Sequence, residues 1–283
     1  MTDNHDQSLG HLPLGKDTEY PDAYDSRLLC PISRAQGRRW ICGDESLIRL
    51  PFKGVDYWNA YEVSWLNAKG KPQVGVLALT VPFDSENIVE SKSLKLYLNS
   101  LNQVRFNHVS DLVELISSDL SAVLGVEAEV RLHQNMDHDG HYAVAELKGE
   151  CIDHLDVEVD QFNHDSSVLK NIGHSGVVSE TLVSHLLRSN CPVTGQPDWA
   201  SVLIRYEGNK IDREALLKYI ISYRTHNEFH EQCVERMFID LSRFCSCAKL
   251  TVYARYTRRG GIDINPFRSN FEMPYPNMRL LRQ

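Results

Sequence analysis

Apolar runs separated by turn residues predict the strands of the first half of the chain. Residues 61–66 alternate between apolar and polar side chains, and residues 73–81 form a longer apolar run, so each is predicted to be a strand. The sequence Lys-Gly-Lys-Pro at 69–72 predicts the turn that joins them. A further strand is predicted at 127–132, and one more near 144–147.

Two helices are predicted between these strands. Leucines at helical spacing predict the first over residues 92–103. The second is predicted to begin with Ser110 as its N-cap and to end at Gly125, because apolar residues recur three and four apart between them. The predicted order of the first half is therefore strand, strand, helix, helix, strand.

The second half repeats this order. Strands are predicted at 182–187 and 200–206, helices at 213–223 and 231–244, and a last strand at 249–256. This order predicts an α+β protein built from two similar modules.

Short sequence matches support a duplication. Gly-Lys-Pro-Gln at 70–73 resembles Gly-Gln-Pro-Asp at 195–198, which lies 125 residues later. Asp-Leu-Ser occurs at both 119–121 and 240–242, which lie 121 residues apart. Together with the shared element order, these matches favour two copies of one module.

The two copies differ in their polar residues. At the offset of 121, residues 90–92 (Glu-Ser-Lys) correspond to residues 211–213 (Ile-Asp-Arg). At the same offset, residues 230–231 (His-Glu) correspond to residues 109–110 (Val-Ser). Each copy carries groups that the other lacks, as expected if both contribute to one composite site.

Length and local composition suggest where the modules begin and end. At 283 residues the chain is long enough for two ordinary domains. Residues 1–45, which are polar and proline-containing without periodicity, are predicted to form an N-terminal arm. The modules are predicted at 46–155 and 179–283, joined by a polar linker at 156–178.

The overall composition argues against several classes of protein. The chain has 42% hydrophobic and 24% charged residues, which is typical of a globular protein. Its 38 acidic and 30 basic residues give a net charge of −8, which argues against a nucleic-acid-binding surface. No apolar run approaches the roughly 18 residues of a membrane span, and the polar N-terminal sequence predicts no signal peptide. We expect a cytoplasmic protein whose seven widely spaced cysteines are free thiols.

The segment 191–198, Cys-Pro-Val-Thr-Gly-Gln-Pro-Asp, is a candidate for nucleophilic chemistry. Its prolines and glycine predict an irregular loop that holds the Cys191 thiol exposed and brings Asp198 close to it. A thiolate attacks electrophilic carbon, and a neighbouring acid assists by proton transfer. The alternative is a buried structural cysteine beside a turn aspartate.

Phe229-His230-Glu231, just before an apolar helix, is a second candidate. His230 can transfer protons, and the Glu231 carboxylate can accept two adjacent N–H groups of a heterocycle such as a purine. Alternatively, these residues cap and solvate the helix N-terminus.

Two further groups are candidates for ligand binding. Val89-Glu90-Ser91-Lys92 lies at the start of the first helix, where ordinary capping is the alternative. Arg255, Arg258 and Arg259 with Gly260-Gly261 can clamp a phosphate, or they form a solvated basic turn.

Common cofactor motifs are missing from the sequence. It contains neither G-x-G-x-x-G nor G-x-x-x-x-G-K-[ST], so neither a Rossmann site nor a P-loop is predicted. No C-x-x-C or H-E-x-x-H spacing occurs, and Cys245 with Cys247 offers too few ligands for zinc. The histidines His133, His138 and His141 lie in an acidic stretch. We predict no metal site.

Four of these segments together resemble one family. Glu-Ser-Lys-Ser-Leu-Lys-Leu-Tyr at 90–97 resembles the signature of the NADPH-dependent 7-cyano-7-deazaguanine reductases, the nitrile reductases of queuosine biosynthesis. Cys191 with Asp198 resembles their nucleophile and acid, and residues 229–231 and Arg259-Gly260 match as well. The resemblance extends from about residue 17 to residue 283 and is to the long bacterial form with two modules.

This resemblance implies a fold and a reaction. The fold would be tandem tunnelling-fold modules, each an antiparallel sheet with two helices. Cys191 would attack the nitrile carbon and form a covalent thioimide, while Asp198 protonates the nitrogen and His230 supplies further protons. Two NADPH and no metal would carry the nitrile to the aminomethyl group of 7-aminomethyl-7-deazaguanine. The protein would be a homodimer that acts on the free base without binding nucleic acid.

The resemblance also assigns binding residues. Val89, Glu90, Ser91, Phe229, His230 and Glu231 would contact the substrate, with the two glutamates on the deazaguanine edge. Ser91, Lys92, Arg259 and Gly260 would contact NADPH.

Two other functions stay open from the residues themselves. A tunnelling-fold protein that binds a purine or pterin without turnover would have no need of Cys191, Asp198 and His230 together. A cysteine-dependent hydrolase or cyclohydrolase on a purine-like base would use those three, but it would not need Lys92 and Arg259-Gly260.

Overall fold

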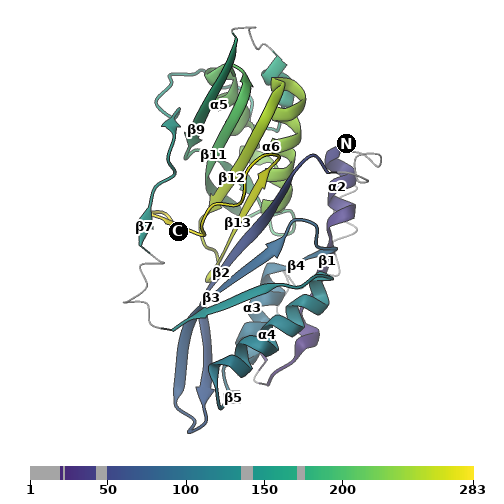
Figure 1. Cartoon of the computed structure of the whole chain (residues 1–283), viewed down its shortest axis with the longest axis vertical. Coiled ribbons are helices and arrows are strands. Elements are labelled where there is room, and N and C mark those ends of the chain that lie inside the picture. The colour runs from purple at the N-terminus through teal and green to yellow at the C-terminus, as the bar shows by residue number, and fades with distance from the viewer. Residues whose placement is uncertain (1–19, 22, 43–49, 135–142, 171–175) are drawn as a thin grey trace. The chain divides into compact units, whose positions relative to one another are not determined.

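A computed structural model describes residues 20–21, 23–42, 50–134, 143–170 and 176–283. The chain forms two compact units, which are described separately. The first comprises residues 1–37, 57–142 and 258–263, and the second comprises residues 38–56, 143–257 and 264–283. Each unit joins a mainly antiparallel set of strands to helices, so the predicted α+β class is confirmed (Figure 1). The module boundaries proposed from the sequence stay a prediction.

The sheet of the first unit contains strands in the order β6-β3-β2, and the short β5 (Arg105–Phe106) runs parallel to β2. The long strands β2 (Lys53–Asn67) and β3 (Pro72–Pro82) are joined by a turn in which Gly70 adopts a left-handed φ of 82°. Strand β6 (Glu129–His133) runs antiparallel to β3. The predicted strands are confirmed, although β2 is much longer than residues 61–66.

Two helices follow β3, as predicted. They are α3 (Ser91–Ser100) and α4 (Val109–Leu124), separated by the short strand β5 (Arg105–Phe106). Gly125 ends α4 with a left-handed φ of 70°, as predicted, but Ser110 is not the N-cap. His108 holds that position, because the Asp111 carboxylate accepts its backbone N–H at 3.2 Å and closes the first turn there.

Several short elements form within the predicted N-terminal arm. A turn of 3-10 helix, η1 (Ser26–Leu28), precedes β1 (Pro31–Ser33), which pairs with β4 (Asn87–Val89). Helix α2 (Arg34–Cys42) follows, and the sequence analysis did not predict it. Two buried arginines, Arg34 and Arg38, lie on α2, so its inward face does not show an apolar pattern.

The sheet of the second unit is built around β11 (Pro197–Asn209), which pairs antiparallel with β9 (Val177–Ser184) and β12 (Cys247–Tyr256). Strand β13 (Ile262–Ser269) pairs with β12, β10 (Arg188–Asn190) pairs with β11, and β8 (Glu150–Cys151) runs parallel to β9. Figure 1 shows helices α5 (Arg213–Ser222) and α6 (His230–Cys245) against one face of this sheet. Each unit thus has the sheet and two helices expected of a tunnelling-fold module.

Two predicted strands lie elsewhere than expected. The strand predicted at 182–187 ends at Ser184, because the Asp153 carboxylate accepts the backbone N–H of His185 and ends the ladder there. The strand predicted near 144–147 is only β7 (Val144–Ala145), which pairs with β14 (Arg279–Leu280) outside the main sheet.

Equivalent interactions recur in the two units and support the predicted duplication. The Tyr97 hydroxyl on α3 donates to Asp119 on α4 at 2.7 Å, and the Tyr219 hydroxyl on α5 donates to Asp240 on α6 at the same distance. Gly70 and Gly195 both occupy left-handed turns before a long strand. The two aspartates lie 121 residues apart and the two glycines 125, the offsets on which the sequence alignment was based, whereas the two tyrosines lie 122 residues apart.

The alignment is wrong by one residue at the first helix. Glu90 is the N-cap of α3, and Asp212 is the N-cap of α5, so Glu90 corresponds to Asp212 rather than to Ile211. The offset along this helix is therefore 122, and the extra residue of the first copy lies between its two helices.

Within the part of the chain that the structure describes, no helix is both long and apolar enough to cross a bilayer.

Candidate active site

The segment that carries Cys191 is a closed turn between β10 and β11 of the second unit. The backbone N–H of Cys191 donates to Gln196 O at 2.9 Å, and Gly195 N–H donates back to Cys191 O at 3.0 Å. The irregular loop is confirmed, but the thiol is buried, with only 3% of the residue exposed. The expected exposure is wrong because the segment before α6 packs against this end of β10, where Asn190 N–H donates to His226 O.

Asp198 and His230 come together in the same unit. Asp198 is the second residue of β11 rather than part of a turn, and it is 6% exposed. His230 is the first residue of α6, and its Nε2 lies 3.3 Å from Asp198 Oδ2. The imidazole also stacks on the ring of Tyr256 with centroids 3.8 Å apart and planes 1° apart. Its orientation is therefore fixed from two sides.

His230 keeps one ring nitrogen available. Among the described residues, its Nδ1 is buried without a hydrogen-bond partner. Tyr256 is fully buried at the end of β12, and burial raises its pKa well above the ordinary value, so its hydroxyl stays protonated. An imidazole held by a carboxylate and a neutral ring, with one nitrogen open, is suited to proton transfer.

Glu231 lies in the first turn of α6 and is 2% exposed, which excludes the solvated carboxylate of the alternative interpretation. Phe229, the N-cap residue, is half-buried, and its N–H donates to Gln232 Oε1 at 3.1 Å. The helix start is therefore closed by Gln232, and the Glu231 carboxylate is not required as its cap.

A further buried carboxylate, Glu228, precedes this segment and was not predicted. Its Oε2 lies 2.8 Å from His226 Nε2, and Arg236 contacts both carboxylate oxygens. Burial alone would raise the pKa of Glu228, but the bonds from His226 and Arg236 lower it to about 2. The ion pair fixes the backbone just before Phe229.

In the first unit, β4 delivers Val89 and Glu90 to the start of α3. Both residues are buried, each with 1% exposed. The Glu90 carboxylate accepts the N–H of Lys92 at 2.8 Å and of Ser93 at 2.7 Å. Burial raises the pKa of Glu90 even though these N–H groups oppose the shift. Ser91 and Lys92 are half-buried on the first turn.

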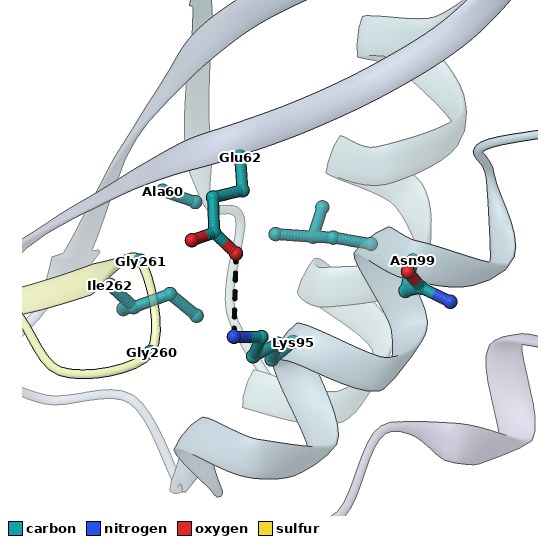
Figure 2. Close-up of a pocket in the computed structure, with 8 residues that line it drawn as sticks. Ala60, Glu62, Lys95, Asn99, Gly260, Gly261 and Ile262 are labelled. Atoms are coloured by element: carbon teal, nitrogen blue, oxygen red, sulfur yellow. Dashed lines mark ion pairs between the residues drawn. The ribbon is translucent and has the colours of Figure 1, made fainter. Parts of the chain in front are cut away.

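The turn at Arg259-Gly260-Gly261 lies against α3 in the same unit. Arg259 N–H donates to Ile262 O at 2.9 Å, and the two glycines have left-handed φ angles of 61° and 78°. A Cβ on Gly260 would lie 3.3 Å from Lys95 Nζ. Figure 2 shows Lys95 reaching Glu62 beside this turn, with Nζ 3.3 Å from Glu62 Oε2.

The other predicted members of this basic group are placed differently. The Arg258 guanidinium lies 4.9 Å from the centroid of Tyr61. Arg255 is buried in the second unit, where it donates to Gln283 and Asn277, so its inclusion in a phosphate clamp is wrong. His138 and His141 lie outside the described residues.

The structure therefore groups the predicted residues into two sets. In the second unit, Asp198 contacts His230, and Cys191 and Glu231 lie in the adjoining turn and helix start. In the first unit, the segment from Val89 to Lys92 lies at the start of α3, and the Arg259-Gly260 turn lies beside the same helix at Lys95. Tyr256 and Glu228 were not predicted from the sequence. The only sequence signal for them is that Tyr256 follows Arg255 and Glu228 precedes Phe229, two residues that were singled out.

Comparison with known proteins points to one family. The family described as "Nitrile reductase, 7-cyano-7-deazaguanine-reductase N-term" matches residues 20–132, and "QueF-like protein" matches residues 197–274. A relative from Cupriavidus metallidurans is 55% identical over 95% of this chain and 96% of its own. A relative from Chromobacterium violaceum is 53% identical over 99% of each chain. Both relatives are named NADPH-dependent 7-cyano-7-deazaguanine reductase. With this identity over nearly its full length, the chain belongs to the family of the NADPH-dependent 7-cyano-7-deazaguanine reductases.

Proposed function

We propose that this chain reduces the nitrile of 7-cyano-7-deazaguanine to the aminomethyl group of 7-aminomethyl-7-deazaguanine, with NADPH as reductant. Family membership supports the substrate and the reductant. The structural observation that carries the proposal is the contact of Asp198 with the stacked imidazole of His230, next to the buried turn of Cys191.

Cys191 starts the proposed reaction. Its thiolate adds to the nitrile carbon, so a carbon–sulfur bond forms and one carbon–nitrogen π bond becomes a lone pair on nitrogen. Asp198 gives that nitrogen a proton, which yields a covalent thioimide. This addition converts an inert triple bond into a carbon–nitrogen double bond that accepts hydride.

Bound NADPH supplies hydride to carbon, and two equivalents are needed per nitrile. After the first reduction, the carbon–sulfur bond breaks, Cys191 departs as a thiolate and an imine is formed. Phe229, half-buried at the N-cap of α6, covers the imine and limits its hydrolysis. His230 donates a proton to nitrogen as the amine forms, because its imidazole is held in place and one ring nitrogen is open.

Two buried carboxylates are proposed to hold the base. Glu90 and Glu231 are each at most 2% exposed, so both carboxylates are shielded from bulk water. The deazaguanine edge presents adjacent N–H groups that match a carboxylate. Val89, Ser91 and His230 complete the contacts in this proposal.

The first unit contains groups that fit the phosphates of NADPH. Ser91 and Lys92 lie on the first turn of α3, and Arg259-Gly260 forms a left-handed turn beside the same helix. Cationic side chains and backbone N–H groups at such a turn are donors to phosphate. We propose that these four residues bind NADPH.

The decisive experiment measures NADPH oxidation by the purified chain. We expect oxidation only when 7-cyano-7-deazaguanine is added, with two NADPH consumed per nitrile. Cys191→Ala should abolish both turnover and the near-ultraviolet absorbance of the thioimide, while Cys247→Ala retains both. Release of ammonia without NADPH would support the hydrolase, and binding of the base without turnover would support the binding module.

Three further properties belong to the same proposal. The chain acts on the free base and needs no nucleic acid, no metal takes part in the reduction, and the protein is a cytoplasmic homodimer. Sedimentation at micromolar concentration tests the homodimer, and an unchanged rate in the presence of tRNA and of a chelator tests the other two statements about the reaction.

A further inference from the structure

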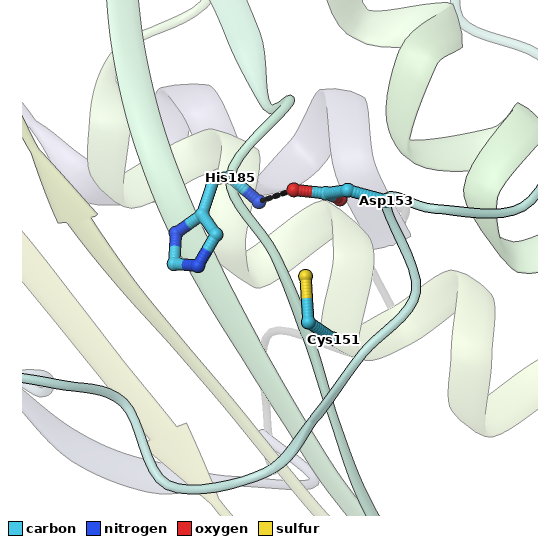
Figure 3. Close-up of side chains that lie close together, drawn as sticks. All are labelled: Cys151, Asp153 and His185. Atoms are coloured by element: carbon cyan, nitrogen blue, oxygen red, sulfur yellow. Dashed lines mark hydrogen bonds between the residues drawn. The ribbon is translucent and has the colours of Figure 1, made fainter.

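A cysteine, an aspartate and a histidine converge at an edge of the second unit, apart from every residue used in the proposed reaction. They are Cys151 on β8, Asp153 just after it, and His185 just after β9 (Figure 3). One ligand atom from each lies within 4.8 Å of the other two. The parallel pairing of Cys151 with Val183 brings these segments together across more than thirty residues of sequence.

Neighbouring groups already orient two of these side chains. The Ser184 hydroxyl donates to Asp153 Oδ1 at 2.6 Å, and His185 N–H donates to Asp153 Oδ2 at 2.8 Å. His185 Nδ1 lies 2.8 Å from Ser201 Oγ, and that oxygen also accepts from Arg282 at 3.3 Å. A hydroxyl oxygen with a cationic donor beside it accepts readily, which favours the tautomer with the proton on Nδ1 and the lone pair on Nε2. Metal-binding histidines are oriented by partners of this kind.

The cluster opens onto a surface cavity of about 600 Å³. Cys151, His185, Ser201 and Arg282 all line it, whereas Asp153 does not. Both Cys151 and His185 are accessible to solvent, so an ion can reach them. A fourth ligand can approach from the cavity.

We propose that Cys151, Asp153 and His185 form a Zn²⁺ site whose fourth position faces this cavity and takes water or a small anionic ligand. Thiolate, imidazole and carboxylate are the ligands that zinc prefers. A tetrahedral zinc separates its ligand atoms by about 3.3–3.6 Å, given metal–ligand bonds of about 2.0–2.3 Å. Closing from 4.8 Å requires shifts of roughly 1 Å, which side-chain rotations supply. A thiolate and a carboxylate balance the two positive charges.

The basic group nearby does not oppose this charge balance. Arg282 donates to the backbone oxygens of His185 and Ala200, at 2.8 and 3.0 Å, as well as to Ser201. The guanidinium thus binds the groups behind His185 rather than the three ligands. It also places a positive charge at the cavity, which favours an anion in the fourth position.

The sequence analysis predicted no metal because it looked for closely spaced ligand pairs. Here Cys151 and Asp153 are separated by one residue, and His185 follows 32 residues after Asp153. Only the pairing of β8 with β9 makes them neighbours. The site uses none of the residues assigned to nitrile reduction, so either proposal can fail without the other.

Zinc binding is tested on the full chain after removal of metals with a chelator. Zn²⁺ is titrated in competition with a chromophoric chelator, and we expect one tight equivalent per chain. Cys151→Ser and His185→Gln should each weaken this binding at least tenfold, and Ser201→Ala should weaken it by a smaller factor. Cys247→Ser and Cys191→Ser are the matched thiol controls and should bind as the wild type does.

Co²⁺ gives a direct view of the ligands. The wild type should show a thiolate-to-cobalt charge-transfer band together with intense visible bands typical of tetrahedral coordination. Cys151→Ser should lose the charge-transfer band. Circular dichroism checks that each variant is folded. Absence of a saturable equivalent in the wild type would overturn the proposal, as would binding that is unchanged in both Cys151→Ser and His185→Gln.

Discussion

Replacing Glu228 by glutamine should destabilise the second unit in a pH-dependent way. The carboxylate is 3% exposed and pairs with His226 and Arg236, both from the segment around the start of α6. Glutamine keeps the size of the side chain but removes the charge, so the half-buried Arg236 guanidinium loses its counter-ion. Breaking one side of a buried pair typically costs about 3–5 kcal/mol.

The magnitude follows from the pKa of Glu228. Burial raises that pKa, the bonds from His226 and Arg236 outweigh burial, and the result is about 2 against an ordinary value of 4.5. A difference of roughly 2.5 units corresponds to roughly 3 kcal/mol of stability. Because the folded-state pKa is the lower one, this stability is complete above about pH 5. It is lost as the pH falls through 4.5 toward 2, and about 2 kcal/mol is gone by pH 3.

Urea unfolding of the wild type and of Glu228→Gln at pH 7, 4 and 3 measures this effect. The difference in free energy of unfolding should be about 3 kcal/mol at pH 7 and about 1 kcal/mol at pH 3. Glu158→Gln, which changes an exposed carboxylate of the same unit, is the control and should differ from the wild type by less than about 0.5 kcal/mol at each pH. A difference that stays constant between pH 7 and pH 3 would refute the reasoning, because it would show that the pKa of Glu228 is not lowered by folding.

Three further predictions concern the candidate active site. Tyr256→Leu should lower kcat about tenfold because the stacking surface under His230 is lost, whereas Tyr256→Phe should stay near the wild type; equal rates in steady-state NADPH oxidation would contradict this. Lys92→Ala should raise the KM for NADPH about tenfold and leave the KM for the nitrile within twofold, and the opposite pattern would remove Lys92 from the cofactor site. Because burial raises the pKa of Glu90 and the base binds its ionised form, nitrile affinity in Cys191→Ala protein should fall as the pH drops through that pKa. A calorimetric profile that stays flat from pH 8 down to pH 4.5 would argue against Glu90 as a ligand.

Periodicity was a good guide to the helices because it depends only on neighbours along the chain. Helix α5 begins at Arg213 and α6 within one residue of the predicted start, since each buries one apolar face. Where a distant side chain decides, the prediction failed: Asp153 ends β9 by taking the N–H of His185, and no local pattern contains that information.

The same limit applies to the site. The sequence singled out Asp198 and His230 by residue type, but the ring of Tyr256 that fixes His230 belongs to a strand about 26 residues further on. The burial of Cys191 could not be predicted from the sequence either. Cys191 was expected to be exposed because its loop contains prolines and a glycine, yet the covering segment at His226 is distant in sequence.

Glu90 and Asp212 are N-caps at equivalent positions of the two units, and comparing them distinguishes the capping role of Glu90 from its proposed binding role. Asp212 on α5 accepts the N–H groups of Glu214 and Ala215 while exposed to solvent, so capping at this position requires no burial. Glu90 makes the same two bonds on α3 but is 1% exposed, and its desolvation opposes the charge that a cap needs. A carboxylate has about four acceptor positions, and the two backbone N–H groups together with the Ser91 side chain do not use all of them. Capping therefore accounts for the bonds of Glu90 but not for its burial, which favours the second role proposed for Glu90 in binding the base.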